Sequence, residues 1–241
     1  MKTAPAVPAA TSGQFRNNPL PARLLFVPVS REHDHTGTGG TTVTSVAGLI
    51  LAAGQGQRLG QPKATVQFAG ERLVDRSIHT LRSAGCAPVV AVTGAVQLSL
   101  DGVRQVHNPD WASGMGSSLR AGLTALWDEV DAAVIALVDQ PLITPRAVRR
   151  LVAAYTAGGR AVVATYNGQL RNPVLLAGEH WPSVHAMAQG DMGARPFLTA
   201  YSHLVTLVPC DDVASPEDID TLADLERLRA AADLAGDPDR T

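Results

Sequence analysis

The sequence is poor in cysteine, in aromatic residues and in long apolar runs. Two cysteines, Cys86 and Cys210, occur among 241 residues, and they do not have CxxC spacing. This excludes a disulfide-stabilised scaffold and a thiolate zinc site, and it indicates two separate reduced thiols in a cytoplasmic protein. Aromatic residues make up 4% of the chain, which argues against a surface that stacks nucleic-acid bases. No run approaches the roughly 20 apolar residues that a membrane-spanning helix needs.

An excess of basic residues is also missing. Twenty Lys and Arg residues face 22 Asp and Glu residues, so the formal net charge is −2. A chain with this balance lacks the positive field that attracts a nucleic acid or an anionic membrane, so neither is expected as a partner. Hydrophobic residues, in contrast, make up 45% of the sequence. That is enough to build the core of one large domain.

The beginning of the chain differs in composition from the rest. Residues 1–31 contain five of the 16 prolines and no acidic residue. Pro5 and Pro8 interrupt the apolar stretch that a secretory signal would need. We therefore expect three parts: a disordered or weakly ordered arm, one folded domain and a short tail, spanning residues 1–45, 46–232 and 233–241.

From residue 46 onwards, apolar runs alternate with segments of helical periodicity. The apolar runs predict strands at 46–52, 88–93, 132–138, 161–165, 173–176 and 204–208. The periodic segments predict helices near 73–84, at 119–127, from Pro145 onwards and after a capping box at Ser215 and Asp218. Strands that alternate with helices predict an α/β fold, with a mostly parallel, Rossmann-like, doubly wound sheet. The segment 161–176 is expected to form a small antiparallel insertion.

A glycine-rich loop follows the first expected strand. Residues 51–63 read LAAGQGQRLGQPK. Glycines let backbone N–H groups approach a phosphate chain closely. Arg58 adds a planar, forked cation and Lys63 adds a compact one. In parallel sheets, ligands bind where the carboxyl ends of strands meet loops, so this loop predicts a polyphosphate site.

Other interpretations of this loop fit less well. Its G-x-G-x-x-x-G spacing differs from the G-x-G-x-x-G of a dinucleotide fold, and no acidic residue ends a second strand about 20 residues further on. Lys63 is followed by Ala64, whereas a Walker A loop requires Ser or Thr there. An ordinary tight turn would need glycine but not two cations.

The loop resembles the LAAGxGxRxGxPK signature of the MobA-like nucleotidyltransferase superfamily. Within that superfamily the chain is most similar to molybdenum cofactor cytidylyltransferases. Further matching motifs follow in order at residues 108–122, 137–141, 172–176, 190–195 and 215–218. The resemblance covers residues 46–228, and it implies transfer of a nucleotide to a phosphorylated acceptor with Mg²⁺ as cofactor.

The resemblance also implies a set of site residues. Lys63 would bind the attacking and transferred phosphates, and Arg58 the leaving pyrophosphate. The nucleotide would be bound by Leu51, Ala52, Ala53, Gly54, Gly56, Asn108 and Ser118. The acceptor would face Asn172, Asp191 and Arg195. From spacing alone, Asp191 and Arg195 could equally form an ion pair at a helix end.

Asp139 is the expected metal ligand. It directly follows the apolar run 132–138, and a carboxylate at the carboxyl end of a strand, opposite a phosphate loop, suits Mg²⁺. The alternative is a surface Asp that caps the next turn. The family usually carries a second acidic ligand directly before the SPED motif, where this chain has Ala214. Asp212 is the nearest acid upstream and is expected as the substitute ligand.

These assignments predict transfer of CMP from CTP to the phosphate of a molybdopterin-type molybdenum cofactor. A phosphate monoester is mostly dianionic at neutral pH, so its attack needs no general base. Ala53 stands where guanylyltransferase relatives tend to carry glycine, which favours CTP over GTP, and a molybdenum hydroxylase apoenzyme would receive the product. The alternatives are a phospholactate guanylyltransferase, a sugar-phosphate nucleotidyltransferase and, because Ala214 replaces an acid, a non-enzymatic nucleotide-binding cofactor chaperone.

Overall fold

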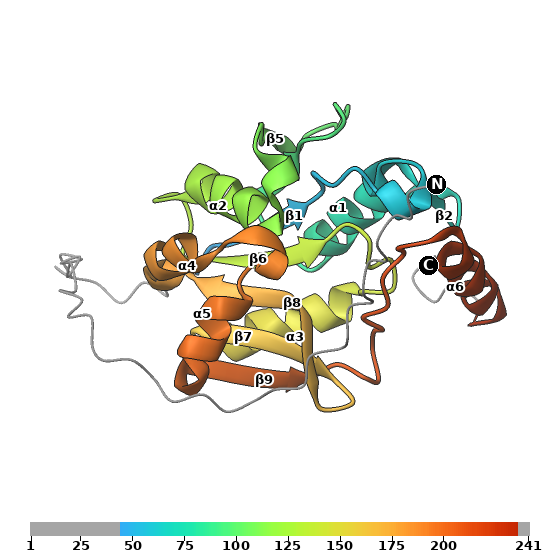
Figure 1. Cartoon of the computed structure of the whole chain (residues 1–241). Helices are drawn as coiled ribbons and strands as arrows, with labels where there is room; N and C mark the ends of the chain where they lie inside the picture. The colour runs from blue at the N-terminus through green and yellow to red at the C-terminus, as the bar shows by residue number, and fades with distance from the viewer. Residues whose placement is uncertain (1–43, 236–241) are drawn as a thin grey trace, which may run out of the picture. The chain divides into compact units, whose positions relative to one another are not determined.

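The computed structural model describes residues 44–235 (Figure 1). The expected N-terminal arm, apart from its last two residues, and the last six residues of the expected tail lie outside the described residues. None of the described helices is long and apolar enough to cross a membrane.

The described part of the chain is built on a seven-stranded sheet with the order β5-β4-β1-β6-β8-β7-β9. Continuous apolar runs form its central strands, as expected of strands that are covered on both faces. The sheet extends from β1 through β4 to one side and through β6 to the other, so a topological switch point lies at β1. The strands are β1 Val46–Leu51, β4 Val89–Thr93, β5 Arg104–His107, β6 Ala132–Leu137, β7 Ala161–Tyr166, β8 Gln169–Ala177 and β9 Val205–Pro209.

The expected antiparallel insertion lies within the main sheet. Strand β8 pairs antiparallel with both β6 and β7, whereas the other neighbours in this sheet pair in parallel. A separate two-stranded antiparallel sheet, β2 Gln67–Phe68 and β3 Glu71–Arg72, was not expected from the sequence. The prediction of a mostly parallel sheet with an antiparallel insertion is confirmed.

Helices cover both faces of the sheet. Side chains of β1 alternate between the two hydrophobic clusters: Ile50 packs on the α1 and α3 side, while Leu49 packs on the α2 and α4 side. Thr144 caps α3 as expected, because its hydroxyl accepts the Ala147 N–H at 3.3 Å. The helices are α1 Leu73–Ser83, α2 Met115–Leu126, α3 Pro145–Thr156, α4 Trp181–Met187, α5 Arg195–Ala200 and α6 Leu222–Ala235.

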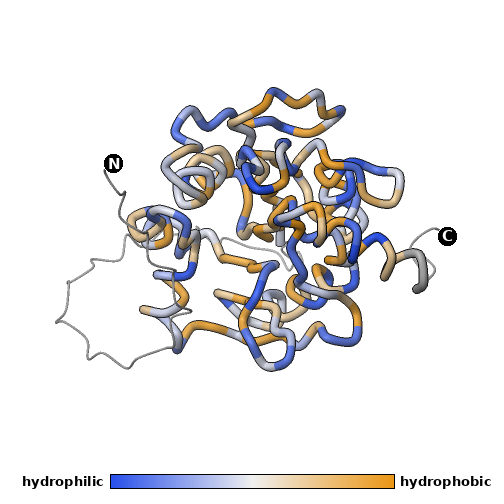
Figure 2. Tube along the Cα trace, turned by 45° about the vertical axis from the view of Figure 1, so that its right-hand side comes forward, coloured by the Kyte–Doolittle hydropathy of each residue, from blue (hydrophilic) through white to orange (hydrophobic). Residues whose placement is uncertain are grey.

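The prediction that the last helix opens at Ser215 is wrong. Helix α6 begins at Leu222, and the capping pair is Thr221 with Asp224: the Thr221 N–H donates to Asp224 Oδ2 at 2.9 Å and the Asp224 N–H donates to Thr221 Oγ1 at 3.2 Å. Residues 215–220 precede the helix without regular secondary structure. Figure 2 shows hydrophilic stretches in the loops that connect the elements. The segment 215–220 brings several polar residues to the site described next.

Candidate active site

A cleft of about 440 Å³ opens at the carboxyl ends of β1 and β6. These strands are adjacent and parallel, with Leu51 paired to Leu137, so the segments that follow them start side by side. This is the edge at which α/β sheets bind ligands. The cleft is lined by Leu51, Ala53, Gly54, Gln55, Gly56, Gln57, Lys63, Trp111, Ala112, Gly114, Met115, Ser118, Leu137, Val138, Asp139 and Asp191.

Gly54 and Gly56, in the loop after β1, have different structural roles. Gly56 has φ +66°, and a Cβ there would lie 2.1 Å from the Gln61 carbonyl oxygen, so only glycine allows the loop to close on itself. Gly54 has open space around its Cβ position, which leaves its backbone accessible from the cleft. Leu59 is buried and anchors the loop to the core. Gly56 and Leu59 together therefore define the shape of the loop.

Three elements far apart in the sequence bring their charges together at Lys63. Its Nζ lies 2.6 Å from Asp139 Oδ2 and 2.5 Å from Asp220 Oδ1. Arg58 Nη2 lies 2.8 Å from the other oxygen of Asp220. The side chains of Lys63 and Asp139 are mostly buried, whereas that of Arg58 is 70% exposed. Two cations and two carboxylates thus lie in one group at the rim of the sheet.

The pKa shifts of Lys63 and Asp220 favour the charged form of each. Burial lowers the pKa of Lys63, but the charges and hydrogen bonds of Asp139 and Asp220 outweigh burial, so the net shift is upward from 10.5. The hydrogen bond from Lys63, with the charges of Lys63 and Arg58, lowers the pKa of Asp220 although partial burial opposes this. Burial raises the pKa of the neighbouring Asp218. Lys63 is therefore a cation and Asp220 an anion under ordinary conditions.

The Asp139 carboxylate has an oxygen that could bind a divalent cation. Asp139 Oδ1 is buried and has no hydrogen-bond partner among the described residues, and such an oxygen is costly unless a ligand satisfies it. Carboxylate oxygens are the ligands that Mg²⁺ prefers. Within residues 44–235 no three His, Cys, Asp or Glu side chains form a complete protein cage for a metal. Mg²⁺ usually completes its coordination with water and substrate phosphates, so an incomplete protein set suits it.

The expectation that Asp212 supplies the second metal ligand needs correction. Both of its carboxylate oxygens accept from Arg150, at 2.6 and 2.7 Å, and the side chain is 64% exposed. The acidic residue beside Lys63 is Asp220, which the sequence analysis did not select. The signal was the alternation of Asp218 and Asp220 around Ile219, because in a chain without helical turns alternate side chains point the same way. Ile219 is fully buried, which turns its neighbours towards the charged group.

Asn108 acts on the cleft through its neighbours. It is 3% exposed and is not among the lining residues. Its Nδ2 donates to Ser117 Oγ at 2.8 Å and to Ser118 Oγ at 3.0 Å, and its Oδ1 accepts the Asp110 N–H. Ser118 does line the cleft. Asn108 therefore orients the serines at the start of α2.

Two glycines at the start of α2 allow the segment 188–191 to approach closely. A Cβ on Gly114 would lie 2.4 Å from the Gly190 carbonyl carbon, and a Cβ on Gly116 would lie 2.8 Å from that of Ala188. This contact places Asp191 at the cleft, where its Oδ1 accepts the Met115 N–H at 3.4 Å. The carboxylate thus lies at the positive end of the α2 dipole. The sequence analysis gave no packing role to these glycines.

The remaining predicted site residues do not line the cleft. Ala52 is buried in the core, and its N–H donates to the Val92 carbonyl. Asn172 lies in β8 and Arg195 begins α5, and neither lines the cleft. Their roles towards an acceptor stay predictions.

Comparison with known proteins identifies the family. Residues 48–207 match the MobA-like NTP transferase domain. The chain is 38% identical over 205 residues to the nicotine blue oxidoreductase of Paenarthrobacter nicotinovorans, which covers 79% of this chain and 99% of that protein. It is 37% identical over 83 residues to a probable molybdenum cofactor guanylyltransferase of Opitutus terrae, covering 34% of this chain and 41% of that protein.

Solved structures share the fold of this chain. The crystal structure of a homologue of Mycobacterium tuberculosis Rv0371c, from Mycobacterium sp. strain JC1, matches with a TM-score of 0.69 and 27% identity over 79% of this chain and 98% of that one. The 2-C-methyl-D-erythritol 4-phosphate cytidylyltransferase of Thermus thermophilus shares the fold, with a TM-score of 0.63 and 20% identity over 79% of this chain and 100% of that one. The chain belongs to the MobA-like nucleotidyltransferase family.

Proposed function

We propose that this protein transfers CMP from CTP to the phosphate of a molybdopterin-type molybdenum cofactor and releases pyrophosphate. The observation that carries the proposal is the position of Lys63 between two carboxylates at the rim of the cleft, within 2.6 Å of Asp139 and 2.5 Å of Asp220. Cations and carboxylates together suit phosphoryl chemistry, in which catalysis is mainly positioning and charge neutralisation.

The reaction forms one phosphorus–oxygen bond and breaks another. An oxygen of the acceptor phosphate attacks the α-phosphorus of CTP, and the bond from that phosphorus to the oxygen bridging to the β-phosphate breaks. The electron pair leaves with pyrophosphate. Since the attacking phosphate is mostly dianionic at neutral pH, no side chain has to accept a proton. This agrees with a cleft lining that contains no His or Cys.

Lys63 and Arg58 would each neutralise the negative charge of different phosphate groups. Lys63 is mostly buried and protonated, so it would bind the attacking and transferred phosphates. Arg58 is exposed and long enough to follow a leaving group, so it would bind pyrophosphate. Asp139 and Asp220 would hold Mg²⁺, which supplies additional neutralisation of the phosphate charge when bound.

The nucleotide would lie along the loop after β1 and the start of α2. A cleft of about 440 Å³ is in the size range of small-molecule sites. The backbone of Leu51, Ala53, Gly54 and Gly56 would contact the triphosphate and ribose, and Ser118 the base. On the far side, Asp191 would meet the acceptor, with Asn172 and Arg195 behind it. The cytoplasm and a molybdenum hydroxylase apoenzyme remain the proposed location and partner.

A second candidate comes from the comparisons. The relative that covers nearly the full domain at 38% identity is named as an oxidoreductase of nicotine blue. Reduction of such a compound by a reduced nicotinamide, which is oxidised in the same step, is therefore an alternative for this cleft. The loop spacing, which is not that of a dinucleotide fold, favours transfer instead.

A panel of reactions tests the proposal. Pyrophosphate release is measured with Mg²⁺, purified molybdenum cofactor and either CTP or GTP, and separately with phospholactate or a sugar phosphate as acceptor. A parallel arm follows the absorbance of nicotine blue with a reduced nicotinamide. Release that requires CTP and molybdenum cofactor supports the proposal. Release only with another pair, binding of CTP without release, or bleaching of the dye without release would each replace it.

A further inference from the structure

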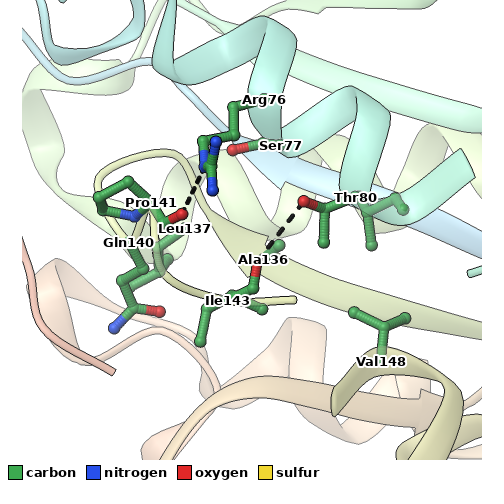
Figure 3. Close-up of a pocket in the computed structure, with 10 residues that line it drawn as sticks. Arg76, Ser77, Thr80, Ala136, Leu137, Gln140, Pro141, Ile143 and Val148 are labelled. Atoms are coloured by element: carbon green, nitrogen blue, oxygen red, sulfur yellow. Dashed lines mark hydrogen bonds between the residues drawn. The ribbon is translucent and has the colours of Figure 1, made fainter. Parts of the chain in front are cut away.

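Gln140 stands directly after the metal-binding candidate Asp139, but its side chain serves another segment. The residue is 6% exposed. Its Nε2 donates to Asp218 Oδ1 at 2.7 Å and to the Pro216 carbonyl oxygen at 3.0 Å. Figure 3 shows its side chain directed away from Arg76 of α1. One buried amide thus connects the end of β6 with the segment that carries Asp220.

Backbone hydrogen bonds run beside this contact. The Ile219 N–H donates to the Asp139 carbonyl at 2.9 Å, and the Ser215 N–H donates to the Leu142 carbonyl at 3.2 Å. On the other side, Arg76 Nε donates to the Pro141 carbonyl at 2.6 Å, which fixes the same loop to α1 (Figure 3). The loop 139–142 is therefore held by α1 and in turn holds residues 215–220.

The chemistry at this contact requires an amide. Gln140 faces two acceptors, a carboxylate and a carbonyl, so only its NH₂ group can satisfy both. Its other atom, Oε1, is buried and has no hydrogen-bond partner among the described residues. Losing this donor would leave Asp218 Oδ1 and the Pro216 carbonyl oxygen without the hydrogen bonds that they accept from Gln140. The segment would then be expected to move away from β6.

We infer that Gln140 is a positioning residue: its amide fixes the turn 216–220 on the end of β6 and thereby sets the position of Asp220 against Lys63 and Asp139. The expected effect of Gln140 on catalysis rests on the proposed function. The expected effect on the positions of Asp139 and Asp220 does not. Lys63 contacts Asp139 and Asp220 within 2.6 Å. A shift of the turn by about 1 Å would move Asp220 away from Lys63. Displacements of that size in catalytic sites lower the reaction rate strongly.

Two variants of the full chain test the inference. Gln140→Met keeps the length of the side chain and removes both hydrogen bonds. The double variant Gln140→Glu with Asp218→Asn restores only one of the two contacts, because the Asn amide can donate to the Glu carboxylate whereas the Pro216 carbonyl loses its donor, and it leaves the net charge unchanged. Gln105→Glu, an exposed position on the edge strand β5, is the control for a Gln-to-Glu change. The affinity for Mn²⁺ alone, the melting temperature, and kcat and KM for the nucleotide are measured for each.

Gln140→Met is expected to weaken Mn²⁺ binding and to lower kcat, each by about 10–100-fold, as loss of outer-shell partners does, while the protein stays folded. The exchanged pair is expected to recover part of both, and Gln105→Glu to match the parent. Mn²⁺ affinity of the parent in Gln140→Met would overturn the inference, whereas recovery in the exchanged pair would support it. If the parent transfers no nucleotide, the proposed function fails, yet the Mn²⁺ series still decides the role of Gln140.

Discussion

Lys63 and Asp220 are separated by 157 positions in the chain, yet Lys63 Nζ lies 2.5 Å from Asp220 Oδ1. The loop after β1 supplies the ammonium, and the segment before α6 supplies the carboxylate. Asp139, which follows β6, accepts from the same ammonium. Because the three segments meet only in the folded domain, this contact couples the phosphate loop to the far end of the described chain.

Asp220 and Asp212 give the first prediction. Asp220→Asn removes a charge that contacts Lys63, which lines the cleft, so kcat for nucleotidyl transfer should fall by about 10²–10³-fold, the effect of losing a charge-stabilising group. Asp212→Asn breaks only an exposed pair with Arg150, so kcat should stay within about twofold, the scatter expected of a surface change. Steady-state kinetics of the two variants provide the comparison. Equal losses of kcat in both variants would show that Asp220 has no specific role in nucleotidyl transfer.

The second prediction concerns Lys63. Lys63→Met keeps the aliphatic stem and removes the ammonium, which leaves Asp139 and Asp220 facing each other without their shared cation. We expect kcat to fall by about 10²–10³-fold. Near-parental turnover in this variant would remove Lys63 from the catalytic set. Circular dichroism on the same sample establishes that the fold is retained.

The third prediction tests the packing of α2 against the segment 188–191. Gly116→Ala would place a Cβ 2.8 Å from the Ala188 carbonyl carbon. Backbone atoms cannot move aside as a flexible side chain can, so the variant should lose about 1–3 kcal/mol of unfolding free energy. KM for the nucleotide should rise as well, because Asp191 and Ser118 shift with the contact. Gly54→Ala is the control, because its Cβ would meet no atom within 4 Å, and its unfolding free energy should stay close to that of the parent. Gly60→Ala is unsuitable as a control, because Gly60 has φ +77°.

The fourth prediction concerns acid stability. The hydrogen bonds from Arg150 lower the pKa of Asp212 from 3.8 to about 2. A carboxyl with a depressed pKa in the folded protein stabilises it above the unfolded pKa, and this stabilisation is lost as the pH falls through the folded pKa. Between about pH 5 and pH 2 the unfolding free energy of Asp212→Asn should therefore depend less on pH than that of the parent. Urea titrations at several pH values measure this; parallel pH profiles would speak against the pair.

The sequence predicted the sheet well because buried parallel strands appear as continuous apolar runs. The runs that became β1, β4 and β6 are apolar without alternation, and each is followed by a loop with its own polar pattern. Asp139 follows from that regularity, since it stands close to the end of β6, and Lys63 follows from the glycine-rich loop after β1. The place of β8 inside the sheet does not follow, because strand order depends on long-range pairing.

Asp220 was missed for a related reason. The pattern Ser215 to Asp218 is typical of a capping box and predicts a helix, and a helix would point Asp218 and Asp220 in different directions. In the structure the backbone of this segment bonds to the loop after β6, and helix formation starts at Leu222. Tertiary hydrogen bonds thus override a local signal. Gln140 was inconspicuous in the sequence because a single amide carries no pattern.

The central claim is that the cleft holds a triphosphate for attack at its α-phosphorus. The most direct measurement uses CTP labelled at the α-phosphorus, mixed with the full chain, Mg²⁺ and molybdenum cofactor, with separation of the products over time. The account predicts that the label moves into a cofactor–cytidine dinucleotide at the rate at which unlabelled pyrophosphate appears. Label that stays in CTP, or that appears only as free CMP, would contradict it.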